Sequence, residues 1–246
     1  ITRGMLGLTK NGMQSLPPMS ADRITRDFEA SLARALPFGQ FRVHEQAAAD
    51  YFEVSRTIIR ELLSRFQDRG LVKKDKRSHW VLGPLTARDI KHYFAIRSQL
   101  EPLALMDSAP FLKPFELEEY LRHARSATNL EYNLKPEKIE AFERDLHISL
   151  ISKTPNTHLL RMLHQSQIAL SINKVFAETL GSRPFRAALI EHCMVFELIS
   201  RGSSRAGSEA LREHLELSAA RTQERLMSFS VFPQPDFPNY LRSIPV

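Results

Sequence analysis

Three histidines and one glutamate stand out by their spacing as candidate ligands of a metal ion. Glu143 and His147 are four residues apart, so in a helix both side chains project from one face. His192 and His214 each lie eleven residues from Ser203, so a helical hairpin that turns near this serine brings them to the same level. Three imidazoles and one carboxylate suit a borderline divalent ion, with zinc expected first and nickel, manganese or iron as alternatives.

A small carboxylic acid is the expected effector at such an ion. Four protein ligands leave positions open on an ion that accepts five or six, and the acid would fill them. Arg97 is the candidate for a second contact with the acid, because a guanidinium matches a carboxylate through two parallel hydrogen bonds. The alternative for Arg97 is a structural ion pair with Glu101, four residues further along.

A second group of residues suits contact with nucleic acid. Between Ser55 and Arg77 lie eight arginines and lysines but only three acidic residues, so most of the net charge of +6 is concentrated there. Arg56 and Arg60 are four residues apart near the start of a predicted helix, where a recognition helix meets base edges and phosphates. Such a concentration is expected of a polyanion-binding face, although a solvated arginine-rich face is the alternative.

The elements around these arginines predict a winged helix-turn-helix over residues 20–83. Apolar spacing predicts helices over 20–36, 44–52 and 55–69. Short apolar segments, 71–72 and 80–82, predict a β-hairpin around a basic tip, Lys73 to His79. Gly83 and Pro84 then break the chain, so a domain boundary is expected there. Residues 1–19 show no periodicity and are predicted to be an arm.

Beyond this boundary the sequence predicts an all-helical domain over residues 84–229. About six helices are expected, over 86–107, 114–127, 136–152, 157–179, 183–200 and 205–227. Helices of this number and length pack as an antiparallel bundle. The predicted fold class is therefore mainly α, with a small β-hairpin wing in the N-terminal winged helix-turn-helix, and residues 230–246 form a proline-bearing tail.

Composition excludes several other classes of protein. With 246 residues, 43% of them hydrophobic, the chain suits two modest domains with ordinary cores. The single cysteine, Cys193, excludes an internal disulfide and any multi-cysteine zinc or iron–sulfur site. No run of about 18 apolar residues and no signal-peptide pattern is present, so a cytoplasmic protein without a membrane partner is expected.

The N-terminal part resembles the winged-helix region of GntR-family bacterial transcription regulators. The resemblance rests on residues 54–63, which read VSRTIIRELL, and on Arg-Gly-Leu-Val at 69–72. Residues 36–39 and the helix over 45–51 are similar to the turn and second helix of that family. Two departures are present: Ile58 stands where the family usually has proline, and the wing lacks the usual glycine. The resemblance implies DNA contacts from Arg56 and Arg60, with support from Ser55, Thr57 and His79.

The helical part resembles the FCD domain, the ligand-sensing domain of the FadR-like branch of the same family. Residues 97–101 are similar to its opening helix, 142–147 to its helix with an acid and a histidine, and 191–192 with His214 to its closing histidines. Glu143 stands where the family usually has aspartate. Six bundle helices are closer to the VanR-type subgroup than to the seven-helix FadR type. Both resemblances together cover about residues 20–228.

These observations predict a homodimeric transcription regulator that responds to an effector, and not an enzyme. Two-fold symmetry would place the helix over 55–69 of each subunit in successive major grooves of double-stranded operator DNA. A small organic acid at the metal would bias the dimer between two arrangements, with repression relieved by the acid as the expected sign. A metal-dependent hydrolase and a helical scaffold without metal are the alternatives, but no hydrolase motif is found.

Overall fold

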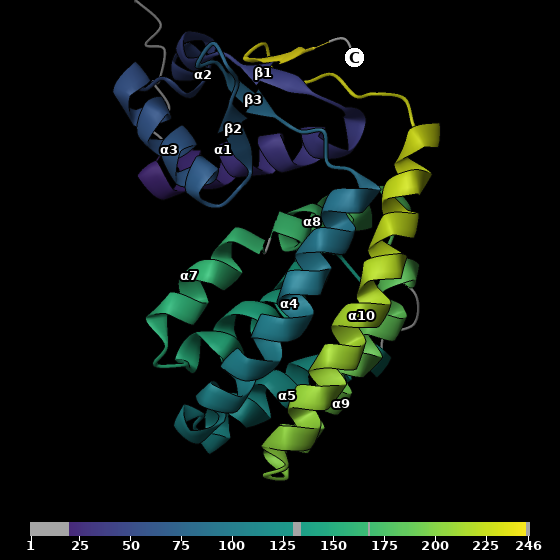
Figure 1. The fold of residues 1–246 in the computed structure, drawn as a ribbon. Coiled ribbons are helices and arrows are strands. Elements are labelled where there is room, and N and C mark those ends of the chain that lie inside the picture. The colour runs from purple at the N-terminus through teal and green to yellow at the C-terminus, as the bar shows by residue number, and fades with distance from the viewer. Residues whose placement is uncertain (1–19, 130–133, 167, 245–246) are drawn as a thin grey trace, which may run out of the picture.

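The computed structural model describes residues 20–129, 134–166 and 168–244. Figure 1 shows a small unit of helices and strands at one end of the molecule and a bundle of longer helices below it. The predicted arm, 1–19, lies outside the described residues. None of the helices in the described part of the chain combines the length and apolar character that a membrane span requires.

The small unit has the three predicted helices, α1 (Ala21–Ala35), α2 (Glu45–Phe52) and α3 (Arg56–Asp68). Serine side chains cap the first and third, because Ser20 and Ser55 each accept a hydrogen bond from the backbone N–H three residues later. The three helices pack around Phe28, whose ring lies 5.3 Å from that of Phe52 and 5.6 Å from that of Phe66. This aromatic core holds α3 with its N-terminal arginines outward.

The sheet beside these helices has four antiparallel strands in the order β2-β3-β1-β4. The predicted hairpin is confirmed as β2 (Val72–Lys74) and β3 (Trp80–Leu82). The other two strands, β1 (Phe41–Val43) and β4 (Leu241–Ser243), were not predicted from the sequence. Strand β4 belongs to the segment that was predicted to be a tail, and it pairs with β1 over its whole length.

The C-terminal segment is anchored to the small unit by Tyr240. This side chain is fully buried, its ring lies 5.5 Å from Phe28, and its hydroxyl donates to Ser31 Oγ over 2.7 Å. The backbone N–H of His44 also donates to the carbonyl of Tyr240. Figure 1 shows the yellow C-terminal segment leaving the last bundle helix and returning to the sheet. The last bundle helix is therefore tied to the small unit through the chain itself.

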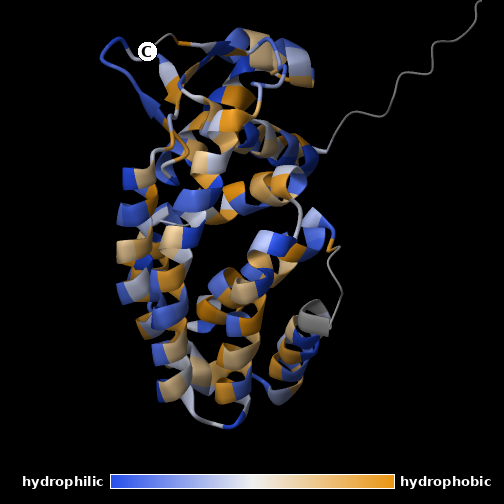
Figure 2. Ribbon diagram, turned by 90° about the vertical axis from the view of Figure 1, so that its right-hand side faces the viewer, coloured by the Kyte–Doolittle hydropathy of each residue, from blue (hydrophilic) through white to orange (hydrophobic). Residues whose placement is uncertain are grey.

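The bundle contains all the predicted helices, with differences in two of them. Its members are α4 (Ala87–Ser108), α5 (Pro114–Asn129), α6 (Pro136–Arg144), α7 (Thr157–Ser166), α8 (Ile168–Leu180), α9 (Arg186–Ser200) and α10 (Ser204–Ser228). The helix predicted over 157–179 is described as α7 and α8, on either side of residue 167, which is not described. The helix predicted over 136–152 ends as α6 and continues as a π-helical segment, Asp145–Leu150. Figure 2 shows hydrophilic and hydrophobic residues alternating around the bundle helices, as expected of helices with one buried face.

Candidate functional site

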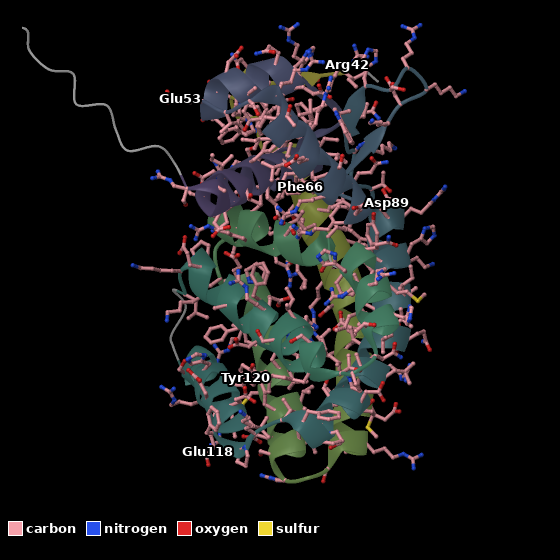
Figure 3. The ribbon with its side chains drawn as sticks, turned by 90° about the vertical axis from the view of Figure 1, so that its left-hand side faces the viewer. Arg42, Glu53, Phe66, Asp89, Glu118 and Tyr120 are labelled. Atoms are coloured by element: carbon pink, nitrogen blue, oxygen red, sulfur yellow. The ribbon has the colours of Figure 1, made fainter. Side chains whose placement is uncertain are left out.

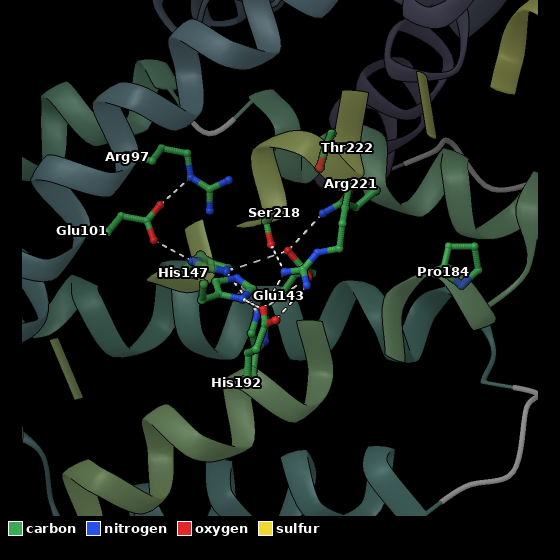
Figure 4. A network of polar contacts seen from close by, with 12 residues as sticks. Arg97, Glu101, Glu143, His147, Pro184, His192, Ser218, Arg221 and Thr222 are labelled. Atoms are coloured by element: carbon green, nitrogen blue, oxygen red, sulfur yellow. Dashed lines mark hydrogen bonds and ion pairs between the residues drawn. The ribbon is translucent and has the colours of Figure 1, made fainter. Parts of the chain in front are cut away.

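Three predicted metal ligands, His147, His192 and His214, meet inside the bundle. All three side chains are buried, and one ring nitrogen from each lies within 4.8 Å of the others. The Nε2 atom of His192 lies 3.3 Å from that of His147 and 3.1 Å from that of His214 (Figure 4). Distant parts of the sequence thus bring three imidazole nitrogens to one point.

The α9–α10 hairpin positions two of these histidines. Its turn contains Gly202 at φ +75°, a left-handed conformation that favours glycine. The helices approach closely at Gly207, where an added Cβ would lie 2.9 Å from the side chain of Ile199. This tight antiparallel pairing places His192 and His214 at the same level, as the spacing from residue 203 predicts. His147 comes from the π-helical segment after α6, a local geometry that is frequent at functional sites.

Two carboxylates, of buried Glu101 and partly exposed Glu191, orient two of the rings. Glu101 Oε2 lies 2.6 Å from His147 Nδ1, and Glu191 Oε2 lies 2.6 Å from His214 Nδ1. An ionised carboxylate only accepts, so each Nδ1 carries the proton and donates it, which leaves the Nε2 lone pair to the shared point. The Nδ1 atom of His192 has no partner that meets the geometry of a hydrogen bond among the described residues. The backbone of Phe142 nevertheless acts to raise the pKa of His192, against the larger lowering effect of burial.

The electrostatics favour neutral imidazoles at His192 and His214. Burial, followed by repulsion from the other two histidines and Arg97, lowers the pKa of His192 well below 6.5. Burial also lowers the pKa of His214, against the opposing hydrogen bond to Glu191. For Glu101, burial raises the pKa, but Arg97 and the hydrogen-bonded histidine outweigh it and bring the value to about 2. Neutral imidazoles and ionised carboxylates are the protonation states that a metal site requires.

The histidine cluster fits a divalent transition metal ion. With metal–nitrogen bonds of about 2.1 Å, two ligands of one ion lie about 3.0 Å apart in octahedral and about 3.4 Å apart in tetrahedral geometry. The two Nε2 separations from His192, 3.3 Å to His147 and 3.1 Å to His214, fall in that range. Glu143 lies further away, with its oxygens 4.0 Å from His147 Nε2 and 3.9 Å from His192 Nε2, and it accepts a hydrogen bond from Asn173. Its carboxylate would therefore have to shift to coordinate the same ion.

Arg97, the predicted effector contact, forms the ion pair that the sequence left as the alternative. Its Nε lies 2.6 Å from Glu101 Oε1, and the side chain is buried. One terminal nitrogen, Nη2, is also buried and has no hydrogen-bond partner among the described residues. Figure 4 shows Arg97 and Glu101 on one side of the histidines. The ion pair with Glu101 thus leaves the Nη2 group of the guanidinium without an acceptor among the described residues.

Further polar residues of the site were missed by the sequence analysis. Glu191 binds Arg221 through two contacts, of 2.7 and 2.6 Å, in addition to its contact with His214. Arg225 is only 5% exposed, its guanidinium lies 4.1 Å from the ring centre of Phe185, and burial lowers its pKa to about 10. The sequence contains a pattern that could have predicted them, because polar residues recur at helical spacing along one face of α10. This polar face consists of His214, Ser218, Arg221, Thr222 and Arg225.

The predicted DNA-contacting arginines lie on the exposed side of α3. Arg56 and Arg60 are 52% and 55% exposed, and each forms an ion pair with Glu45 Oε2, at 2.9 and 2.7 Å. The indole N–H of Trp80 donates to the other oxygen of Glu45. Burial alone would raise the pKa of Glu45, but these three hydrogen bonds lower it. Glu45, which the sequence analysis did not single out, therefore fixes the position of both arginines.

The remaining residues predicted on α3 occupy its N-terminal turn. Ser55 is the N-cap, and its hydroxyl accepts from the N–H of Ile58 over 3.3 Å. Thr57 is exposed beside it. Ile58, which stands where the family usually has proline, is 41% exposed. Residues at helical spacing, Ile59, Leu62, Leu63 and Phe66, already fill the buried face of α3.

The wing has the geometry of a tight turn built without glycine. Ser78 adopts φ +61°, a left-handed conformation uncommon for residues other than glycine. Asp75 stabilises the turn by accepting the backbone N–H groups of Arg77 and His79. His79 is exposed, and its Nδ1 lies 3.2 Å from Asp75 Oδ2. A groove of about 520 Å³ separates wing and α3, and its lining includes Arg42, His44, Glu45, Arg56, Arg60 and His79.

Comparison with known proteins identifies the family. Residues 92–217, just over half of the chain, match the FCD domain. The chain belongs to the FCD-domain branch of the GntR family of transcriptional regulators. Over 176 residues it is 27% identical to the uncharacterized HTH-type transcriptional regulator YdhC of Bacillus subtilis (strain 168), which covers 70% of this chain and 77% of that protein.

Solved structures have the same fold as this GntR regulator. McbR/YncC of E. coli matches with a TM-score of 0.64 at 16% identity, covering 82% of this chain and 98% of that one. A GntR protein of Rhodococcus sp. RHA1 matches with a TM-score of 0.62 at 15% identity, covering 83% and 97%. The family resemblance seen in the sequence is confirmed, whereas the VanR-type subgroup stays a prediction. Membership of the family favours a regulator over the hydrolase and scaffold alternatives.

Proposed function

We propose that this GntR regulator is a homodimeric repressor whose affinity for operator DNA is set by a metal centre and a small carboxylic acid. The observation that carries the proposal is the convergence of three buried imidazoles, two of which, His147 and His214, are oriented by carboxylates. His147, His192 and His214 would hold the ion, and Glu143 would join after a small shift. Zinc is the first candidate, with nickel, manganese or iron as alternatives.

DNA binding would use helix α3 and the wing, both within the winged helix-turn-helix domain of residues 20–83. The exposed Arg56 and Arg60, held by Glu45, are placed to meet base edges and phosphates in the major groove. Ser55 and Thr57 at the same helix end and His79 in the wing would add contacts to the backbone. These contacts should depend strongly on salt, because neutralised phosphates release counterions.

The acid would bind inside the bundle domain, residues 84–229, beside the ion. Arg97 supports this proposal, because its buried Nη2 has no partner among the described residues and a buried unpaired donor is costly. Buried Arg225, whose Nε also has no such partner, adds a second cationic group along α10. Because α10 continues into the segment that carries β4, rearrangement of α10 on binding would reach the winged helix directly.

A dimer is supported by an apolar face of α4. Ile96, Leu103 and Met106 are between 39% and 54% exposed and lie at helical spacing. Exposed apolar side chains that share one face of a helix are typical of interaction sites. Two-fold pairing of bundles would present two α3 helices to a near-palindromic operator.

The experiment that tests the DNA-binding function is a mobility shift with a duplex selected by the full-length protein from a random pool. Arg56→Ala and Arg60→Ala should each weaken the complex while the melting temperature stays that of wild type. Arg205→Ala, at an exposed position of α10, is the matched control and should bind as wild type does. Wild-type affinity in both α3 variants would contradict the assignment.

A further inference from the structure

The outer face of the winged-helix sheet carries a row of positive charge. Strand pairing places Arg242 of β4 directly opposite Arg42 of β1, Arg42 opposite Val81 of β3, and Val81 opposite Lys73 of β2. Residues directly opposite on neighbouring strands share one face of a sheet. The row therefore contains three cations and one valine, and Val81, which is only 3% exposed, separates Lys73 from the two neighbouring arginines.

The other face of the sheet is the core face, so Arg42 and Arg242 cannot turn inward. Residues on either side of it in the strands are buried, among them Phe41, Val43, Trp80, Leu82 and Leu241. Because side chains alternate between the two faces of a strand, Arg42 and Arg242 must lie on the opposite side. Arg242 is exposed. Figure 3 shows Arg42 at the end of the molecule farthest from Glu118 and Tyr120 of the bundle.

Among the residues that the structure describes, little negative charge compensates these two arginines. Arg42 Nη2 lies 3.9 Å from Asp75, which also contacts His79, and Arg42 Nε is buried without a hydrogen-bond partner among the described residues. Burial and then the charges of Arg242, Arg42 and His79 lower the pKa of His44, so the positive potential extends along this face. Like charges directly opposite each other destabilise a pair of strands, and a bound polyanion would remove that penalty.

The row borders the groove in which the predicted DNA contacts lie. Arg42 and His44 line the groove together with Arg56 and Arg60 of α3. Arg242, as the cross-strand neighbour of Arg42, extends the same surface by one strand. A duplex whose major groove receives α3 would present its sugar–phosphate backbone to this sheet face.

We infer that the C-terminal strand β4 is part of the DNA-binding surface, and that Arg242 together with Arg42 binds the phosphate backbone beside α3. This inference rests on the proposed DNA-binding function. It adds a contact from the far end of the chain, in the segment that directly follows the helix carrying His214. Phosphate contacts carry no sequence information, so Arg242 should contribute affinity and not sequence preference.

The test measures the dissociation constant of full-length protein for the selected duplex, and for an unrelated duplex, over a series of KCl concentrations. Arg242→Gln should raise the dissociation constant about three- to tenfold for both duplexes at low salt and reduce the slope of log Kd against log[KCl] by about one. Arg242→Lys keeps the charge and should keep the slope. Arg205→Gln, an exposed arginine of α10, is the matched control and should behave as wild type.

The melting temperature separates a lost phosphate contact from a lost strand. Removing one of two opposed charges should leave the free Arg242→Gln protein at least as stable as wild type while its DNA affinity falls. If Arg242→Gln melts at a lower temperature than wild type, Arg242→Lys is the deciding variant, because it should retain both the strand and the charge. Wild-type DNA affinity of Arg242→Lys would support the inference. An affinity as low as that of Arg242→Gln would overturn it.

Failure of this inference is distinguishable from failure of the proposed function. Wild-type affinity and salt slope in Arg242→Gln, combined with weak binding by Arg56→Ala, would overturn only the role of β4. Wild-type behaviour in both variants would overturn the DNA-binding role of α3 as well.

Discussion

The hydrogen bond from His214 to Glu191 makes a sharp prediction about metal affinity. Glu191→Gln changes one carboxylate oxygen into an NH2 group and keeps the side-chain size. The 2.6 Å contact of Glu191 with His214 Nδ1 fixes the ring so that Nε2 faces the other two histidines. A glutamine can still accept one hydrogen bond, but it carries no charge and holds the imidazole less strongly.

The expected loss of affinity follows from that geometry. A hydrogen bond to a charged group contributes about 1.5–3 kcal/mol, and loss of a partner that orients a metal-binding histidine typically costs 10–100-fold in affinity. Because Glu191 is partly exposed and also binds Arg221, solvent can compensate part of the change. We therefore expect a reduction in zinc affinity of about tenfold or somewhat more, equivalent to about 1.4 kcal/mol.

Zinc affinity would be measured by competition with a chromophoric chelator at constant pH. Glu197→Gln is the matched control, because Glu197 lies on the same helix, is more exposed and pairs with Arg125 rather than with a histidine. The control should bind zinc as wild type does. Equal affinity in wild type and Glu191→Gln, or an equal loss in both variants, would refute the role of Glu191.

Three further predictions concern binding, stability and pH. Arg56→Ala and Arg60→Ala should each weaken binding of the selected duplex by about 1–3 kcal/mol, measured by fluorescence anisotropy, and unchanged affinity would contradict the recognition role of α3. Tyr240→Ala should lower the free energy of unfolding by about 3–5 kcal/mol and Tyr240→Phe by about 1 kcal/mol in denaturant titrations, and an effect near zero for both would show that the C-terminal segment is not docked. The metal-free protein should lose stability as pH falls below about 6.5, because burial lowers the pKa of His192 and His214 and the unfolded chain then binds more protons; a melting temperature that stays constant down to about pH 5.5 would contradict this.

Local patterns in the sequence were sufficient for much of the fold. Helix periodicity and capping residues predicted α1 to α3, and the spacing of His192 and His214 from residue 203 predicted that the α9–α10 hairpin would bring them level. The sheet was only half predicted. Strands β1 and β4 are three residues long, and their partners lie far away in the sequence, so no local pattern marks them.

For the candidate site, the sequence predicted the candidate ligands but not the residues that hold them in position. Glu101 and Glu191 bind ring nitrogens across helix interfaces, which spacing along one helix cannot reveal. Glu45 similarly lies on α2 and holds arginines of α3. These errors share one cause, namely that side-chain partners from other elements are set by tertiary packing.

The central claim is that the histidine cluster controls the affinity of α3 for DNA, and the dissociation constant for the selected duplex tests it most directly. Zinc-loaded wild-type protein and His192→Ala, each of confirmed metal content, would be titrated with the duplex in the presence and absence of a panel of small carboxylic acids. The account predicts that at least one acid changes the wild-type dissociation constant about tenfold and leaves that of His192→Ala unchanged. Equal responses of the two proteins to every acid would contradict it.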